Sequence, residues 1–489
     1  MSIPSTLLPR LRQLVRAALG QSSPLILARL LSAALTFGLP LVLVRLLEPQ
    51  AFGTYKQFFL VSMTVLMIGQ LGLTQSLFYF LPRGGAERGA YVTHTLGSLT
   101  ILGLVFGGGL AILAPWVAAW VGSPELAHVA LPLGLYTAAM LGAAPLEGAL
   151  TSEGRLGGAA TSYVITDAVR AGALVLAAKF FGGTGIYWAA ALVALLRVGA
   201  LWLLVARRIL PIERPHAGLW RKQLAYALPF AGASLLYVGQ RYFSQYAVSA
   251  SFDPATFALF AVAAFHLPVV DIVYTPVSEV LMVQLGKHDA SQALKHWDDG
   301  VRKLAAILFP ATCGAFILGP TILPLLFTHK YAGSVPLFLL TTLEIPLWIL
   351  PVDALLRASN DTRFLFAFNG VRILITGAAV LTGIRVAGLP GAILGGIASE
   401  AVARVVMLAR GRRFLAPHAR VSQLLDWNAL GRIAVASLLA GVPAWAMRLA
   451  LPPGMGMVVA AIGVYGVAYV ALYRTLVNRA RAELVFSPG

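Results

Sequence analysis

The sequence predicts an all-α integral membrane protein with about fourteen transmembrane helices. Hydrophobic residues make up 58% and charged residues only 11% of the chain, whereas a soluble domain carries roughly 25% charged residues. The apolar runs are about 20 to 27 residues long, which is enough for a helix to cross about 30 Å of hydrocarbon. They lack the alternation of barrel strands, so helices are the structure that can satisfy the backbone in lipid.

The apolar runs place the expected spans along the chain. Prolines inside many of them predict kinks, since proline removes a backbone donor. The spacings Gly103-x-x-x-Gly107 and Gly391-x-x-x-Gly395 predict close helix packing. The predicted spans are 23–46, 55–81, 91–113, 127–149, 160–181, 184–205, 224–250, 255–285, 303–327, 333–356, 364–384, 388–409, 429–450 and 455–476.

Basic residues predict the orientation of these spans. Of the 37 Lys and Arg residues, 25 fall on one set of alternate loops and 6 on the other. Cytoplasmic loops carry the excess of Lys and Arg, so we expect both termini to be cytoplasmic. This topology also explains the net charge of +18 without a nucleic acid partner.

An internal repeat divides the chain into two pseudo-symmetric six-helix lobes plus two extra C-terminal helices. Glu48-Pro49 recurs as Asp253-Pro254, and three further landmarks recur at offsets between 202 and 207 residues. The expected organisation is a cytoplasmic amphipathic N-terminal segment at 1–22, an N-lobe at 23–205, a cytoplasmic linker at 206–223, a C-lobe at 224–409, a cytoplasmic loop at 410–428, spans 13 and 14 at 429–476, and a cytoplasmic tail at 477–489.

Six arginines fall within the predicted spans. Each costs about 2.5–3.5 kcal/mol near a helix centre, so such residues face a cavity or a partner. Three lie near cytoplasmic helix ends, where they either snorkel to the interface or line a cavity; these are Arg29, Arg197 and Arg404. The other three lie near mid-span, where we expect them to line a cavity; these are Arg170, Arg241 and Arg372.

Acidic residues share these spans. Asp167 with Arg170 and Glu400 with Arg404 have the spacing of ion pairs on one helix face, which serve either a cavity or membrane insertion alone. Two further acids, Asp271 and Glu344, have no basic partner on the same helix. They are the candidates for a coupling site that takes H⁺ or Na⁺.

After this pairing, Arg29, Arg241 and Arg372 are left for a substrate. Guanidinium offers a fork of donors that matches phosphate, so an anionic, phosphate-bearing substrate is expected rather than a cationic drug. The sequence has no metal-ligand spacing, nucleotide-binding loop or nucleophile motif. We therefore expect neither an enzyme nor a bound cofactor.

Residues near the start suggest a family. The stretch from Leu43 to Tyr55, LVRLLEPQAFGTY, followed by Leu71-Gly72-Leu73 and by SLFYFLPR ending at Arg83, resembles the opening of bacterial polysaccharide flippases of the multidrug/oligosaccharidyl-lipid/polysaccharide exporter superfamily. In span count and two-lobe repeat, the resemblance covers most of the chain. It implies a cavity between two lobes that opens to each side of the membrane in turn.

The same resemblance implies the cargo and the place of action. The cargo is a polyprenyl-diphosphate-linked oligosaccharide, moved from the cytoplasmic to the outer leaflet of a bacterial inner membrane for surface polysaccharide biosynthesis. Partners would include the bilayer and the polysaccharide polymerase and assembly proteins. Spans 13 and 14 are similar to the extra pair of lipid-linked peptidoglycan-precursor flippases, in which a first-span arginine contacts diphosphate; Arg29 lies in the comparable region.

Two other functions stay open at this point. A cation-coupled small-molecule or drug antiporter of the same fold would depend on Asp271 or Glu344. A scaffold protein of a polysaccharide assembly machine would need none of the span arginines.

Overall fold

The computed structural model describes residues 23–478, with the exception of 208, 211, 265–268 and 288–289. The predicted segment 1–22 and most of the tail therefore lie outside the described residues. In the described part the chain forms helices and no strands, which confirms the all-α class. Nine of these helices are long and apolar enough to cross a membrane; the count of fourteen stays a prediction.

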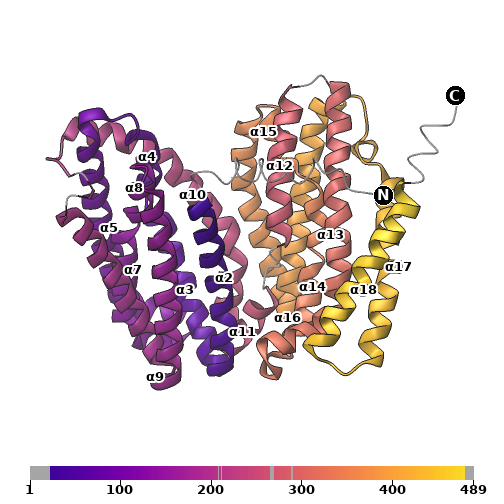
Figure 1. The fold of residues 1–489 in the computed structure, drawn as a ribbon, viewed down its shortest axis with the longest axis horizontal. Helices are drawn as coiled ribbons and strands as arrows, with labels where there is room; N and C mark the ends of the chain where they lie inside the picture. Colours follow the sequence, from indigo (N-terminus) through magenta and orange to yellow (C-terminus); the bar gives the residue numbers. More distant parts are fainter. Residues whose placement is uncertain (1–22, 208, 211, 265–268, 288–289, 479–489) are drawn as a thin grey trace, which may run out of the picture. The chain divides into compact units, whose positions relative to one another are not determined.

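The described chain divides into two units, residues 1–238 and 239–489, which are treated separately below (Figure 1). Unit 1 holds the helices α2 (Ser23–Leu46), α3 (Pro49–Gly69), α4 (Leu73–Phe80), α5 (Arg88–Trp120), α6 (Pro124–His128), α7 (Ala130–Ala143), α8 (Pro145–Ser152), α9 (Leu156–Ala206) and the first part of α10 (Ala217–Ser251).

Small residues set the spacing of α5 and α7 in unit 1. A Cβ on Gly103 would lie 2.6 Å from the Ala138 carbonyl oxygen, and one on Gly107 would lie 2.4 Å from that of Gly134. Both distances are shorter than any real Cβ contact, so only glycine permits this approach. The prediction of close packing at the first GxxxG spacing is confirmed.

The predicted span 55–81 is interrupted in the structure. Leu71 and Gly72 have positive φ angles of 47° and 71°, and they separate α3 from α4. A Cβ on Gly72 would lie 2.5 Å from the Ala227 carbonyl oxygen of α10. The left-handed backbone and this close approach both require glycine, a constraint that the hydropathy of the run does not reveal.

Helix α10 begins at Ala217, inside the segment 206–223 that we expected to be a linker. The reason is a buried amide on its first turns. The Nε2 atom of Gln223 donates to Ser76 Oγ at 2.9 Å and to Thr95 Oγ1 at 2.8 Å. These bonds fix the first part of α10 against α4 and α5, so it belongs to unit 1.

Unit 2 contains the rest of α10 and the elements that follow it. These are α11 (Pro254–Ala263), α12 (Val269–Lys287), α13 (Ala290–Phe327), α14 (Ser334–Thr342), the 3-10 helix η3 (Ile345–Ile349), α15 (Val352–Ala358), α16 (Thr362–Leu415), the 3-10 helix η4 (Val421–Leu424), α17 (Trp427–Ala450), α18 (Met455–Tyr473) and η5 (Arg474–Asn478).

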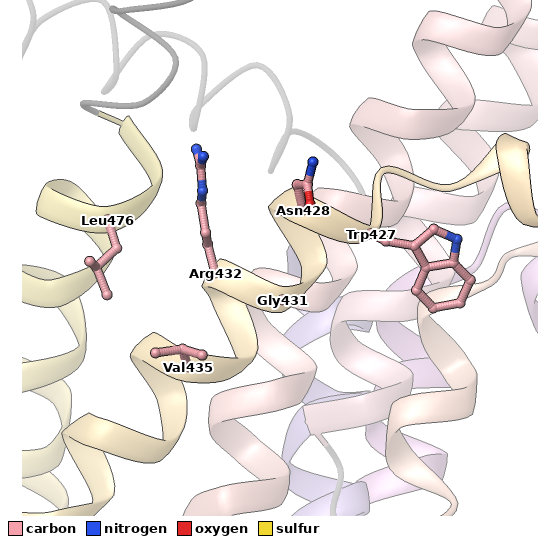
Figure 2. A pocket seen from close by; sticks show the side chains of 6 residues that line it. All are labelled: Trp427, Asn428, Gly431, Arg432, Val435 and Leu476. Carbon is pink, nitrogen blue, oxygen red and sulfur yellow. The ribbon is translucent and has the colours of Figure 1, made fainter.

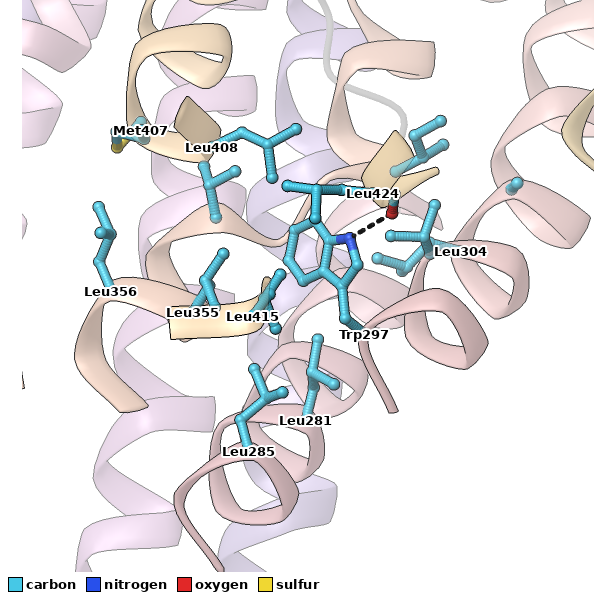
Figure 3. Packing of buried hydrophobic residues seen from close by; sticks show 14 of the residues in the cluster. Leu281, Leu285, Trp297, Leu304, Leu355, Leu356, Met407, Leu408, Leu415 and Leu424 are labelled. Atoms are coloured by element: carbon cyan, nitrogen blue, oxygen red, sulfur yellow. Dashed lines mark hydrogen bonds between the residues drawn. The ribbon is translucent and has the colours of Figure 1, made fainter. Parts of the chain in front are cut away.

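The largest buried side chain of unit 2 is Trp297 on α13, which is 0% exposed. Leucines of several helices surround its ring, among them Leu281, Leu355 and Leu408 (Figure 3). The indole Nε1 donates to the carbonyl oxygen of Leu424 in η4 at 3.2 Å. Trp297 thus joins α12, α13, α15 and α16 to the loop that precedes α17.

Helices α17 and α18, which the sequence placed outside the repeat, pack on α13. Pro310 lacks an N–H, so the carbonyl of Ala306, four residues earlier, loses its helical partner. The hydroxyl of Tyr469 on α18 donates to this carbonyl at 2.7 Å. The hydroxyl of Tyr465 donates to the Pro310 carbonyl at 3.0 Å. Tyrosines of α18 therefore satisfy backbone groups that lipid would leave unpaired.

The repeat is visible in the backbone. Positive φ angles at Gly122, Gly154 and Gly182 in unit 1 recur at Thr328, Asn360 and Gly388 in unit 2, each 206 residues later. Gly182 and Gly388 break the long helices α9 and α16 between the two spans that each of them contains. The offset inferred from scattered side chains is thus also the offset of three turns.

We expect the substitution Trp297→Ala to destabilise unit 2 by about 3–5 kcal/mol, the usual cost of removing a large buried aromatic ring. Trp297→Phe serves as the control, since it keeps most of the packing and loses one hydrogen bond of about 1 kcal/mol. Thermal unfolding of the purified protein in detergent measures both. Equal melting temperatures for the two variants would contradict this account of the core.

The turn before α16 carries a pH-dependent ion pair. Arg410 Nε donates to Asp361 Oδ2 at 2.5 Å, and this hydrogen bond, with the charge of Arg410, lowers the pKa of the Asp361 carboxyl. A lowered folded-state pKa stabilises the fold above the ordinary value of about 3.9, and the effect is lost as pH falls through the folded pKa. Asp361→Asn should therefore lower the melting temperature at pH 7.

The comparison should be made by thermal unfolding from pH 7 down to about pH 3, where the lowered pKa is reached. We expect the gap in melting temperature between the wild type and Asp361→Asn to narrow as the pH falls below about 4. A gap that stays constant over this range would show that the Asp361 charge contributes nothing.

Candidate functional site

Each unit contains a cluster of charged side chains within its apolar helices. The unit 1 cluster consists of Glu147, Asp167, Arg170 and Arg197, and the unit 2 cluster of Glu344, Arg372, Glu400 and Arg404. Ionised groups at membrane depth are costly and mark pathways of ions or substrates. These two clusters are therefore the candidate functional sites.

In the unit 1 cluster, Asp167 and Arg170 lie on the first half of α9 and form an ion pair of 3.0 Å. Helix α2 supplies a hydroxyl to each of them. Ser32 Oγ donates to the Asp167 carboxylate, and Arg170 donates to Thr36 Oγ1 at 3.0 Å. Both charges are thus partnered on their own helix and across to α2.

The second pair of unit 1 joins two helices. Arg197, on the second half of α9, donates to Glu147 Oε2 of α8 at 2.5 Å. Ser162 Oγ donates to the other oxygen of Glu147 at 2.8 Å. Arg197 is therefore engaged in a buried ion pair instead of snorkelling to the interface. The cluster has two positive and two negative groups and is close to neutral.

The unit 2 cluster centres on one carboxylate. Glu400 Oε1 accepts from Arg404 Nε at 2.7 Å, and Glu400 Oε2 accepts from Arg372. Arg404 is 2% exposed, also donates to the Leu350 carbonyl at 2.5 Å, and stacks on the Trp348 ring with 4.3 Å to its centroid. Its donors and its face are thus occupied by protein, and it positions Glu400.

Arg372 differs from the expectation that it has no partner. Its ion pair with Glu400 joins residues 28 positions apart, on the two sides of the break at Gly388. The Arg372 side chain is nevertheless 22% exposed. Two guanidinium groups therefore share one carboxylate, and the more exposed one keeps donors for a further acceptor.

Arg241 lies on the unit 2 part of α10. Its side chain is exposed, and among the described residues it forms neither an ion pair nor a hydrogen bond. A few residues away, Gln240 Nε2 donates to the Asn369 carbonyl of α16 at 2.9 Å. This bond holds α10 against the helix that carries Arg372.

A discontinuous span supplies the remaining acid. The predicted span 333–356 is divided into α14, η3 and α15, with Glu344 at the start of η3. Trp348 Nε1 donates to Glu344 Oε1 at 3.4 Å, and within the described part of the chain Glu344 has no ion-pair partner. Broken helices that free backbone carbonyls, as Leu350 does here, are typical of substrate and ion sites in transporters.

Two predicted residues cannot be assessed. Arg29 lies on α2 and Asp271 on α12, but both side chains are outside the described part of the chain. Among the described residues, no group of three His, Cys, Asp or Glu side chains could hold a metal ion.

The sequence analysis missed several members of the clusters. Glu147 marked the repeat but was not matched with Arg197, and Trp348 and Tyr274 were not considered. The Tyr274 and Trp348 rings pack edge to face at 5.0 Å beside Arg404. Pro145 and Pro351 were the available signals, because each begins or precedes the short helix at which its cluster forms.

The fold is shared with known transporters. A structure of the lipid II flippase MurJ in an inward closed conformation has a TM-score of 0.68 at 10% identity, over 92% of this chain and 98% of that one. A MATE family multidrug resistance transporter of the MOP superfamily matches in its inward-facing form (TM-score 0.59, 16% identity, 80% of this chain and 95% of that one). Its outward-facing form also matches (0.51, 17%, 82% and 94%).

Among curated protein sequences, none matches this chain. The sequence model of a family described as polysaccharide biosynthesis protein matches residues 42–336, more than half of the chain. The match includes the motif near the start and all of unit 1. This multi-pass membrane chain therefore belongs to the polysaccharide biosynthesis protein family, on the fold of MOP superfamily transporters.

Proposed function

We propose that this protein is a flippase that moves polyprenyl-diphosphate-linked oligosaccharide from the cytoplasmic to the outer leaflet of a bacterial inner membrane, for surface polysaccharide biosynthesis. The observation that carries the proposal is the positive excess of the unit 2 helices. Arg372 and Arg404 share the single carboxylate of Glu400, and Arg241 is exposed and unpaired within the described chain.

This arrangement suits a diphosphate. A guanidinium fork binds phosphate oxygens through two parallel, charge-assisted hydrogen bonds. Arg372 is the group of the shared pair that is partly exposed. Bound phosphate would replace Glu400 as its partner, while Arg404 would keep the carboxylate neutralised. The loaded and empty states then both leave no buried charge unpaired, as a reversible transport site requires.

Transport would proceed by alternating access, the cycle that inward- and outward-facing structures of the similar MATE transporter suggest. Glu344 is the acid we assign to coupling, with H⁺ or Na⁺ as the driving ion. Its carboxylate lies in a broken span and contacts Trp348 instead of a cation. Asp271 is the other candidate. The polymerase and assembly proteins would take the flipped oligosaccharide.

We expect Arg241→Gln and Arg372→Gln each to lower the rate of flipping at subsaturating substrate by about 10- to 100-fold, because a hydrogen bond to a charged group contributes about 1.5–3 kcal/mol. The measurement is the protection of a fluorescent lipid-linked oligosaccharide from a membrane-impermeant quencher in proteoliposomes. Arg372→Lys should have intermediate activity, since it keeps the charge and loses the fork.

The matched control is Arg385→Gln. Arg385 is an exposed arginine of α16 close to the break at Gly388, remote in sequence from the cluster, and its removal changes the net charge equally. Wild-type flipping by both cluster variants would refute the anion site. Efflux of a cationic dye instead of lipid-linked sugar would favour the antiporter, and normal export by all variants would favour a scaffold role.

Glu344→Gln should abolish the response of flipping to an imposed H⁺ or Na⁺ gradient, while exchange without a gradient continues. The amide retains an acceptor for Trp348 Nε1 but cannot titrate or bind a cation as a carboxylate does. The measurement is the initial flipping rate with and without each gradient. If Asp271→Asn loses the gradient response and Glu344→Gln keeps it, coupling does not occur at Glu344.

A further inference from the structure

A groove opens between the first turns of α17 and the end of the α18 segment (Figure 2). Its volume is about 320 Å³. Six residues line it: Trp427, Asn428, Gly431, Arg432, Val435 and Leu476. None of them belongs to the charged clusters described above.

The groove lies where the helix pair meets the membrane surface, because α17 begins at Trp427 and α18 with η5 ends at Asn478. The Trp427 side chain is 60% exposed, which is typical of the aromatic belts at the level of lipid headgroups. Below the groove, α17 presents the exposed apolar side chains of Val435, Leu438 and Val442. An acyl chain could lie along this row while its headgroup occupies the groove.

The groove is positively charged. Arg432 is exposed and has no hydrogen bond or ion pair within the described residues, and the same holds for Arg474 near the end of α18. The acid next to Trp427, Asp426, is already occupied: its carboxylate accepts from Arg302 at 2.8 Å and from the Ala429 N–H at 2.9 Å. The first turn of α17 adds the positive end of its helix dipole.

The remaining polar groups refine the ligand. The Trp427 indole N–H donates to the Ser422 carbonyl at 2.7 Å, so it contributes its ring and not a donor. The Asn428 amide is exposed and offers two N–H donors. Donors and positive charge face the groove, with an apolar row beneath them, which fits an amphiphile with an anionic head.

We propose that this groove binds the headgroup of an anionic phospholipid of the bilayer, with Arg432 as its main phosphate ligand. Basic pockets between membrane helices suit such headgroups, because they combine charge attraction with the burial of acyl chain. The proposal does not depend on the transported substrate, since no residue of the groove belongs to the unit 2 cluster. It assigns α17 and α18 the role of a lipid-anchored element.

Native mass spectrometry of the full chain in detergent tests this site, with phosphatidylglycerol and phosphatidylcholine titrated in parallel. The wild type should retain phosphatidylglycerol preferentially, and Arg432→Gln should weaken that binding about fivefold, in line with the attraction of one basic residue. Arg432→Lys should keep most of the binding. Arg385→Gln, which removes an equal charge from an exposed position on α16, should leave the binding unchanged.

Three results would overturn the assignment. One is equal retention of phosphatidylglycerol by the wild type and Arg432→Gln; another is an equal loss in Arg385→Gln, which would indicate a general charge effect. The third is occupation of the site by inorganic phosphate or by a polyprenyl diphosphate, with the same dependence on Arg432 and with displacement of phosphatidylglycerol. Size-exclusion profiles establish that each variant is folded.

Discussion

The polar groups that this chain carries into the bilayer must find their partners within the protein, because hydrocarbon offers none. This constraint explains contacts that otherwise look unrelated. The carbonyl freed by Pro310 is bound by a tyrosine of α18, and the carbonyl of Leu350 in a broken span is bound by Arg404. The same requirement brings Arg197 to Glu147. Helix packing and the charged sites are therefore consequences of one rule.

The two units meet this rule differently on the same backbone plan. Turns recur 206 residues apart, and the breaks of α9 and α16 correspond. In unit 1 each arginine of the cluster has its own carboxylate. In unit 2 two arginines share Glu400. A duplicated scaffold thus holds one nearly neutral cluster and one with positive charge available to an anion, which is how a repeat can acquire a single binding site.

Helices α17 and α18 lie outside this plan. They pack on α13 through tyrosine hydroxyls and through the Arg448 side chain, which donates to the Ile317 carbonyl at 3.0 Å. Their outer faces are apolar, and the groove at one end carries an unpaired arginine. An added helix pair that satisfies the backbone of its neighbour on one side and faces lipid on the other extends the contact of unit 2 with the bilayer.

The sequence by itself determined the helical membrane class, the repeat offset and the pairs within one helix turn, such as Asp167 with Arg170, because hydropathy and the 3.6-residue period are local properties. Tertiary structure decided the partners on different helices. Arg372 meets Glu400 and Arg197 meets Glu147 only because breaks at Gly388 and Gly182 fold two spans of one long helix against each other or against a neighbour. The interruption at Gly72 likewise depends on the approach of α10. No spacing rule reaches across such turns, since the distance between those side chains is set by packing.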